Sequence, residues 1–155
     1  MTTFSPNLIA SIRKASREMV REHGFLDRTL AGTDLSPSAV HTILELGLEQ
    51  ENGLTAKELS ARLNLEKSTV SRMLQSLEKR GEIVAKRRAT DGRSYTLSLT
   101  DRGWKTFKAA STYGETMVTS ALPHLSGATA KDLARTLGAY ADALKAARTG
   151  ETNCG

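Results

Sequence analysis

The sequence predicts a mainly α-helical fold that includes one small β-hairpin. Apolar residues recur at helical spacing in several segments, and typical helix-start and helix-stop residues bound those segments. One Asp-Gly pair, at 91–92, separates two runs with the character of β-strands, and both turn residues tolerate the positive φ of a tight turn. The 155 residues, 39% of them hydrophobic, fit one domain with a modest core.

Two helices are predicted before residue 50. Ser5-Pro6 places a capping side chain before a proline at the first helical position, and apolar residues then recur in steps of four and three up to Gly24. Ser36-Pro37 begins the second helix, and the sequence "ENG" at 51–53 ends it. The predicted apolar face of this second helix consists of Val40, Ile43, Leu44, Gly47 and Leu48.

A short helix and a longer one follow, joined by a four-residue connection. Thr55 is the predicted N-cap of "TAKELSARL", with Glu58 three residues later at the capping-box position. The longer helix, "EKSTVSRMLQSLEKRG", ends at Gly81. Its apolar stripe consists of Val70, Met73, Leu74 and Leu77.

The remaining segments complete the predicted order of elements. Two strands flank the Asp91-Gly92 turn, Thr100-Asp101 begins a long helix, and Ser126 precedes the last helix. Residues 149–155 are predicted to be a disordered tail. A short helix, a tight connection, a longer helix and a basic hairpin follow one another as in a winged helix-turn-helix.

Residues 62–93 carry the whole charge surplus of the chain. The formal net charge is +5, and this segment alone holds nine basic and four acidic side chains. A surplus confined to about a fifth of the chain indicates an electrostatic footprint for a polyanion. Charge alone leaves a solvated surface as the plainer alternative.

One face of the longer helix has the chemistry of DNA recognition. Short hydroxyls permit close approach, an arginine can bond a guanine edge with two hydrogen bonds, and a glutamine amide suits adenine. Lys67 and Thr69 flank this face near the helix N-terminus, where backbone N–H groups favour a phosphate. Many surface helices expose the same residue types, so the pattern alone leaves that alternative open. The residues at i, i+3, i+4 and i+7 on this face are Ser68, Ser71, Arg72 and Gln75.

Residues 54–103 resemble the MarR-type winged helix-turn-helix regulators. The matching pieces are the "ELS–RL" scaffold helix, "KSTVSRMLQSLEKRG" as the recognition helix, and "DGRSYTLSLTDRG" as the wing with its return strand. The flanking helices match in number and length, so the resemblance reaches roughly residues 5–148. Glu82 departs from the pattern, because the family usually has a large apolar residue there; the departure concerns the local packing of the wing.

The resemblance implies how the domain is organised. It predicts a single domain over residues 1–148, with the winged helix-turn-helix at about 36–100 and dimerisation helices at about 5–24 and 126–148. In the last helix an apolar seam repeats at steps of four and three. The alternative is that the first and last helices pack only on each other within one subunit, and the resemblance favours the homodimer. The seam consists of Leu133, Leu137, Tyr140, Leu144 and Ala147.

The resemblance also implies a use for the arginines of the hairpin. Arg93 is expected to enter the minor groove of double-stranded DNA, with Asp91 orienting its guanidinium through a charge-assisted hydrogen bond. Arg87 and Arg88 on the incoming strand are expected to meet phosphates. The plainer alternative for Arg93 is a solvated turn arginine.

A cleft between the dimer helices and the winged domain is a candidate site for a small-molecule effector. Trp104 and Phe107, at i and i+3, fit a core position more often than a ligand site. The three histidines show no spacing typical of metal ligands, so no metal site and no cofactor are expected. The candidate lining residues of the cleft are Arg17, His41, Trp104 and Phe107.

We therefore expect a homodimeric, sequence-specific DNA-binding transcription regulator, a repressor on a palindromic operator, and not an enzyme. No apolar run is long enough to span a membrane, no signal peptide is recognisable, and the lone Cys154 cannot form an internal disulfide, which favours the cytoplasm. Two other classes stay open. The N-terminal stretch is similar to the regulator domain of MarR–acetyltransferase fusions, although no acetyltransferase domain is expected here. A winged-helix module that binds protein is the second.

Overall fold

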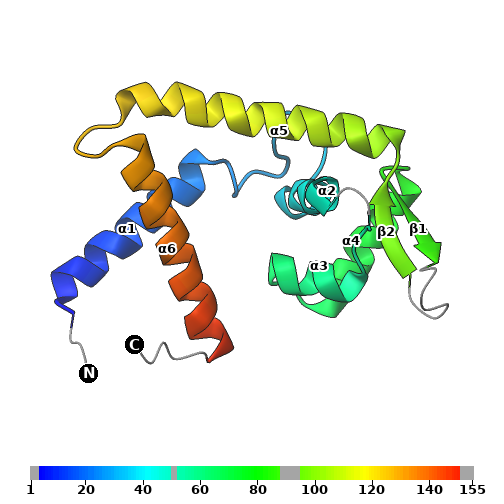
Figure 1. Cartoon of the computed structure of the whole chain (residues 1–155), viewed down its shortest axis with the longest axis horizontal. Helices are drawn as coiled ribbons and strands as arrows, with labels where there is room; N and C mark the ends of the chain where they lie inside the picture. Colours follow the sequence, from blue (N-terminus) through cyan, green and yellow to red (C-terminus); the bar gives the residue numbers. More distant parts are fainter. Residues whose placement is uncertain (1–3, 50–51, 88–94, 151–155) are drawn as a thin grey trace. The chain divides into compact units, whose positions relative to one another are not determined.

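The computed structural model describes residues 4–49, 52–87 and 95–150. Within them the chain is mainly helical with one two-stranded antiparallel sheet, which confirms the predicted fold class (Figure 1). The chain divides into two compact units, residues 1–114 and 115–155, and each is described by itself.

The first unit holds four helices, the hairpin and the start of a fifth helix, within the described residues. The remaining elements follow Gly114 or continue past it. In chain order the elements are α1 (Pro6–Glu22), α2 (Pro37–Glu49), α3 (Ala56–Leu63), α4 (Lys67–Lys79), β1 (Ile83–Arg87), β2 (Tyr95–Leu99), α5 (Asp101–Ala121), the short 3-10 helix η1 (Leu122–His124) and α6 (Ala130–Thr149).

Local capping chemistry starts two of the helices where it was predicted. Ser5 accepts a hydrogen bond from the Leu8 amide at 3.3 Å, ahead of a proline in the first turn of α1. Thr55 and Glu58 form a reciprocal capping box at the start of α3, in which the Thr55 amide donates to Glu58 Oε2 at 2.7 Å. These starts depend only on residues three apart, which is why the sequence alone locates them.

The buried face of α2 differs from the predicted one: Ala39, Thr42 and Leu46 are buried in addition, Leu44 is only half-buried and Leu48 is exposed. Leu48 is 69% exposed, whereas Thr42 is fully buried and donates its hydroxyl to the Ser38 carbonyl at 2.9 Å. The buried residues centre on Ile43, and at 3.6 residues per turn Leu48 lies about 140° around the helix from it. Thr42 can enter the core because its hydroxyl is satisfied within its own helix.

The last helix begins later than predicted. Gly127 has a φ of +77°, which is incompatible with a helix running on from Ser126. Thr129 is the actual N-cap, and it forms a capping box with Asp132. At the other end, Thr149 still belongs to α6 and Gly150 closes it in the left-handed conformation, so the helix reaches into the predicted tail. Residues 151–155 lie outside the described residues.

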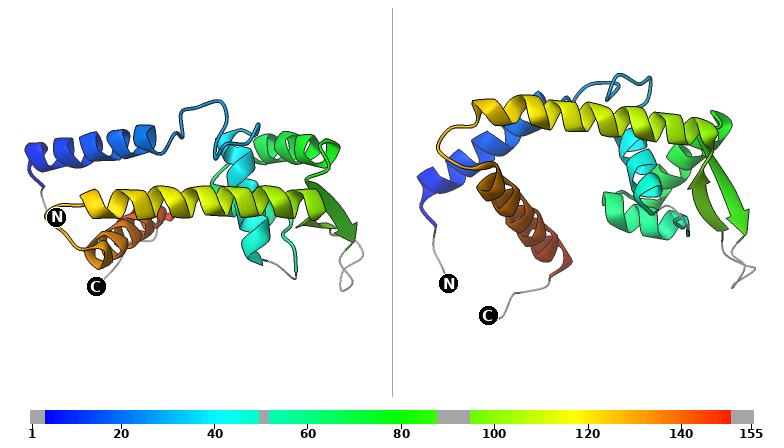
Figure 2. Two further views of the ribbon diagram at one scale, coloured as in Figure 1. Left: turned by 90° about the horizontal axis from the view of Figure 1, so that it is seen from above. Right: turned by 45° about the horizontal axis from the view of Figure 1, so that its top comes forward.

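The core of the first unit lies between α2, α3, α4 and the hairpin, which the two views of Figure 2 show together. Strand β1 pairs with β2 in a register that runs from Ile83–Leu99 to Arg87–Tyr95. Leu54 adds a bridge to Leu97 on the other edge of β2. The largest fully buried side chains in this core are Ile43, Leu59, Leu77, Val40 and Val70.

Two glycines bring the first turns of α5 into close contact with the core. A Cβ on Gly47 would lie 2.2 Å from the Phe107 ring, and one on Gly103 would lie 2.1 Å from the carbonyl oxygen of Glu82. Both distances are far below van der Waals contact, so only glycine fits. The start of α5 therefore lies directly against α2 and against the junction between α4 and β1.

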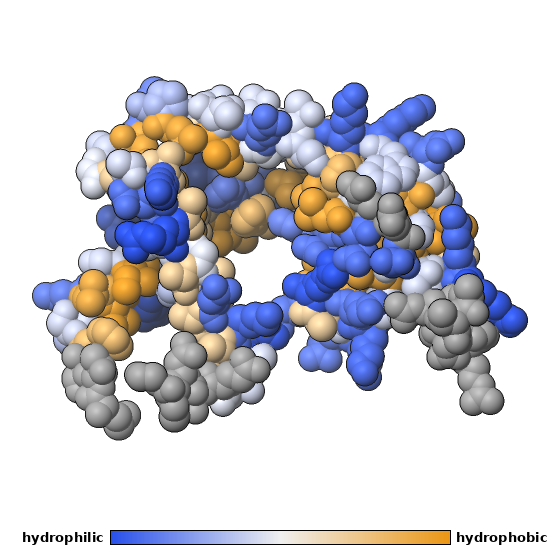
Figure 3. Space-filling model, viewed as in Figure 1, coloured by the Kyte–Doolittle hydropathy of each residue, from blue (hydrophilic) through white to orange (hydrophobic). Residues whose placement is uncertain are grey.

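Helices α1 and α6 each leave an apolar face uncovered. Neither has a buried residue among those described, and Figure 3 shows apolar atoms at the surface along α1 near the N-terminus. On α1 the exposed side chains include Leu8, Ile9 and Ile12, and on α6 they include Leu137, Tyr140 and Leu144. No helix within the described ranges is both long and apolar enough to cross a membrane.

Two alanine substitutions should have opposite effects on stability. Gly103→Ala should lower the free energy of unfolding by about 1–3 kcal/mol, because the new Cβ meets backbone that cannot yield. Gly138→Ala should raise it by about 0.5–1 kcal/mol, because this helical position has open space and alanine favours a helix. Urea unfolding followed by circular dichroism measures both. Equal effects would contradict the packing of α5.

The capping box of α6 should make stability depend on acid. The hydroxyl and amide of Thr129 donate to Asp132 Oδ2 at 2.6 and 3.3 Å and lower the pKa of this carboxyl below its ordinary 3.8. The stability that the ionised carboxylate contributes is therefore full above pH 3.8 and is lost as the pH falls through the lower, folded-state pKa. Thr129→Val should return the pKa toward 3.8 in an NMR titration of the Asp132 carboxyl. An unchanged titration would exclude the bond.

Candidate nucleic-acid interface

Helix α4 buries one side and exposes the predicted recognition face. Val70, Leu74 and Leu77 are buried and Met73 is half-buried, which confirms the apolar stripe. The hydroxyl, guanidinium and amide groups of the opposite face are directed away from the core as a direct consequence of that burial. The exposed residues of this face are Ser68, Ser71, Arg72 and Gln75.

The N-terminus of α4 has the form of an anion site. Its N-cap residue, Glu66, makes no side-chain capping bond, so no side chain of the cap satisfies the amides of the first turn. A shallow cavity of about 840 Å³ opens at this end, bounded by the α3–α4 connection and by Lys67, Ser68 and Thr69. The positive end of the helix dipole and the Lys67 ammonium favour a phosphate there, while the Glu66 carboxylate opposes one.

Short-range hydrogen bonds set the turn between α3 and α4. Asn64 adopts the left-handed conformation, with a φ of +52°, and ends α3. Ser60 then bonds both polar groups of Leu65: its hydroxyl donates to the carbonyl at 2.6 Å and its carbonyl accepts from the amide at 3.1 Å. This tight turn fixes the angle at which α4 leaves α3.

Among the described basic side chains of residues 62–87, Arg62 and Arg80 are paired with acids from outside that segment. Arg62 donates to Glu49 at 2.7 Å and to Glu45 at 3.3 Å, and these carboxylates raise the pKa of the guanidinium. Arg80 pairs with Asp34 and lowers the pKa of that carboxyl. These two arginines tie α4 and α3 to the preceding part of the chain, so they add less to a polyanion site than the formal charge indicates.

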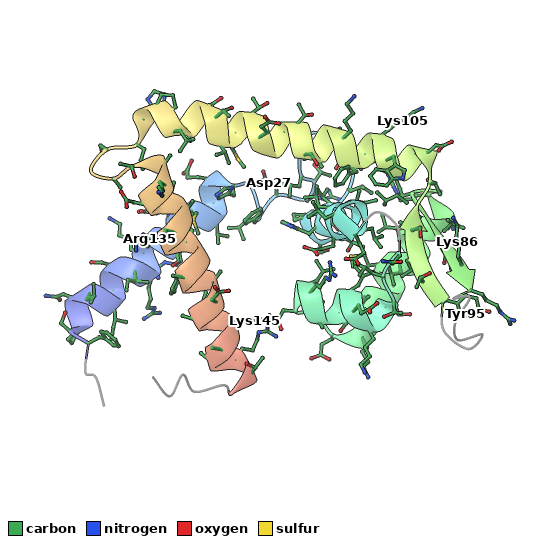
Figure 4. The ribbon with its side chains drawn as sticks, viewed as in Figure 1. Asp27, Lys86, Tyr95, Lys105, Arg135 and Lys145 are labelled. Carbon is green, nitrogen blue, oxygen red and sulfur yellow. The ribbon has the colours of Figure 1, made fainter. Side chains whose placement is uncertain are left out.

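The hairpin holds one of its arginines through a residue that sequence reasoning missed. Arg87 faces Tyr95 across the last described pair of the sheet, and its Nε donates to the Tyr95 hydroxyl at 3.3 Å. The guanidinium carbon also lies 5.8 Å from the centre of the tyrosine ring. Figure 4 labels Tyr95 and its neighbour Lys86 on this hairpin. Counting outward from a two-residue Asp91-Gly92 turn would pair residue 87 with 96, so the spacing in the sequence did not predict the Arg87–Tyr95 pair.

The remaining predicted wing residues are Arg88, Asp91 and Arg93. All three lie outside the described residues. The minor-groove role of Arg93 and its orientation by Asp91 therefore stay predictions.

The candidate effector residues are only partly brought together. Trp104, 38% exposed, meets Phe107 edge to face with ring centres 5.3 Å apart, and Phe107 also packs on the core. His41 is exposed, and the centre of its ring lies 5.5 Å from the centre of the Phe25 ring. Arg17 is exposed on α1. A cavity of about 610 Å³ between residues 28–39 and the C-terminal half of α4 contains none of the four. The effector pocket stays a prediction.

The structure shows how Glu82, which departs from the family pattern, is accommodated beside the wing. Its side chain is 3% exposed, and the carboxylate accepts hydrogen bonds from Arg102 Nε at 3.1 Å and from the Thr106 hydroxyl at 2.8 Å. A polar cluster thus occupies the place where the family usually has an apolar side chain.

An exposed polar helix and a neighbouring basic hairpin are typical of the winged helix-turn-helix fold. Residues 33–94 match the model of the MarR family. The HTH-type transcriptional regulator SarZ of Staphylococcus saprophyticus is 29% identical over 89 residues, which are 57% of this chain and 58% of SarZ. The match thus spans little more than half of that curated relative.

Solved structures extend the likeness to most of the chain. The MepR–DNA complex of S. aureus covers 93% of this chain and 99% of its own, with a TM-score of 0.67 and 24% identity, and it shows the shared fold. The structure of S. aureus MepR bound to ethidium bromide covers 91% of this chain and 97% of its own, with a TM-score of 0.56 and 26% identity. Together these matches show that the chain has the winged helix-turn-helix fold of these structures and that residues 33–94 are similar to the MarR family.

Removing one hydroxyl should release Arg87 without unfolding the hairpin. Tyr95→Phe keeps the ring but removes the acceptor for Nε–H, so this proton should exchange faster with water in NMR spectra. The free energy of unfolding should change by no more than about 0.5 kcal/mol, because the site is exposed. An unchanged Nε–H signal would show that the tyrosine does not hold the arginine.

Proposed function

We propose that this chain is a homodimeric transcription repressor that binds a palindromic operator in double-stranded DNA and is released by a small-molecule effector. The observation that carries the proposal is the outward polar face of α4, with its uncapped N-terminus, in a MarR-type fold. The relatives support it: SarZ is a transcriptional regulator, and MepR is seen in complex with DNA. Neither is described as an enzyme.

The proposed contacts fall into three groups. Arg72 and Gln75 read base edges, and Ser68 and Ser71 allow the helix to approach them. The phosphate contacts are assigned to basic or hydroxyl residues that are exposed or half-buried, and to Arg88, which lies outside the described residues. Arg93, oriented by Asp91, reads the minor groove. The proposed phosphate contacts are Lys67, Thr69, Arg87 and Arg88.

The uncovered apolar faces of α1 and α6 support the dimer. Monomeric soluble proteins rarely expose contiguous apolar surface of this kind, and a second copy of the chain would cover it. A two-fold dimer presents two α4 helices to DNA, which calls for an operator with two related half-sites. A regulator of this kind acts where the chromosome is, so the proposal includes the cytoplasm.

The effector part of the proposal rests on Trp104 and Phe107. The two rings are in contact and Trp104 stays 38% exposed, so part of an aromatic surface is accessible to an aromatic ligand. MepR is seen bound to ethidium bromide, a small aromatic cation. Arg17 and His41 complete the proposed site.

Two single substitutions on α4 should separate base reading from phosphate binding. Arg72→Ala should weaken operator binding by about 1–3 kcal/mol and relax preference at one base position in each half-site. Lys67→Ala should weaken operator and random DNA alike and reduce the salt slope by about one. Fluorescence anisotropy on both duplexes at several salt concentrations measures this. Identical behaviour of the two variants would mean that the assigned face of α4 is wrong.

The proposed function as a whole is tested by selecting duplexes from a random DNA library with the wild-type protein. The selected sequences should share two inverted half-sites with centres about 10 bp apart on one face of the duplex. Binding should weaken steeply as salt rises, because several phosphates are neutralised. A half-turn of added spacer should abolish tight binding. Selection of no sequence, or of a single unpaired half-site, would contradict the proposal.

A further inference from the structure

Glu82 joins three elements through all its polar groups. Its amide donates to the Leu77 carbonyl of α4 at 3.0 Å. Its carbonyl accepts from the Thr100 amide and hydroxyl, each at 3.1 Å, at the end of the wing. Its carboxylate accepts from Arg102 and Thr106 on α5. The recognition helix, the wing and α5 therefore meet at this one residue.

Close packing fixes the point at which α5 begins. Gly103 brings the backbone of α5 against the Glu82 carbonyl, where a Cβ would lie only 2.1 Å away. Thr100 also donates its hydroxyl to the Gly81 carbonyl at 2.6 Å and accepts from the Gly103 amide at 3.1 Å. We call the side-chain cluster of Glu82, Arg102 and Thr106 the Glu82 joint.

Stability alone does not explain a carboxylate at this position. Burying a charge has a desolvation cost, and a well-packed apolar side chain often stabilises a protein as much as a buried ion pair does. What the carboxylate adds is direction, because two hydrogen bonds of defined geometry hold α5 at residues 102 and 106, one turn apart. Apolar contact at the same place would tolerate small rotations of α5.

The direction of α5 matters because the helix is long. Its 21 residues span about 31 Å, so a tilt of about 10° at the first turn moves the far end by about 5 Å. A base-pair step is about 3.4 Å. A tilt of this size is therefore comparable with a shift of the operator spacing by one or two base pairs.

We infer that Glu82 is a positioning residue that sets which spacing of half-sites the protein accepts. It does so by fixing the direction in which α5 leaves the winged helix-turn-helix. The inference rests on the proposed function, since it needs a DNA-binding dimer. It assigns Glu82 no contact with DNA.

The test compares spacing tolerance between variants. Duplexes selected by the wild-type protein are rebuilt with one to five base pairs added or removed at the centre, and a single half-site duplex is included. Glu82→Leu should bind the half-site as tightly as the wild type does. The ratio of its affinities for the preferred and the altered spacings should be at least about tenfold smaller than in the wild type, which corresponds to about 1.4 kcal/mol. Glu82→Gln should keep the wild-type discrimination, because its amide can accept from Arg102 and donate to the Thr106 hydroxyl.

Each outcome has a separate meaning. If the wild-type protein binds no duplex, the proposed function is wrong. If it discriminates between spacings and Glu82→Leu does so equally well, Glu82 is only a packing residue and the inference is overturned. Should circular dichroism show that Glu82→Leu is unfolded, Thr106→Val decides, since it removes one hydrogen bond and keeps the ion pair: relaxed spacing supports the inference, and unchanged spacing overturns it.

Discussion

Burial of one side of α4 is the constraint on which the rest of the structure depends. Val70 and Leu77 are almost completely buried in a core that also contains Ile43 of α2 and Leu59 of α3. Because a helix has only one outward side once the other is buried, this packing decides which residues of α4 meet solvent. The polar face that is proposed to read DNA is therefore exposed as a consequence of the hydrophobic effect acting on the opposite face.

Some basic side chains form ion pairs within the domain, and others are exposed to solvent. Arg62 and Arg80 are engaged by acids of earlier segments, whereas Lys67, Arg72 and Arg87 stay exposed on α4 and β1. Figure 3 shows hydrophilic residues crowding the surface of α3 and α4. An exposed, unpaired cation attracts a phosphate fully, whereas the carboxylate beside a paired cation offsets much of that attraction. The net charge of a segment is thus an upper limit on what a polyanion experiences.

The two ends of the chain have a different character from the winged helix-turn-helix. Helices α1 and α6 have good local start signals and exposed apolar faces, and neither buries a residue among those described. Such helices gain little from their own chain, since helical stability in proteins comes mainly from packing an apolar face. In the proposed dimer a second copy would supply this packing, and folding of these helices would then be linked to dimer formation.

Sequence by itself determined the features that depend on neighbours a few residues apart. The capping box at Thr55 and Glu58, the apolar stripe of α4 and the strands around Asp91-Gly92 follow from spacing and local hydrogen bonds, and they were predicted. The start predicted at Ser126 was wrong, because the positive φ of Gly127 is incompatible with a helix there and Thr129 caps the helix instead. Tertiary structure alone decided that Thr42 rather than Leu48 enters the core and that Glu82 meets Arg102. The physical reason is that burial and pairing depend on groups from distant parts of the chain. Local periodicity in the sequence carries no information on how those groups are oriented relative to one another.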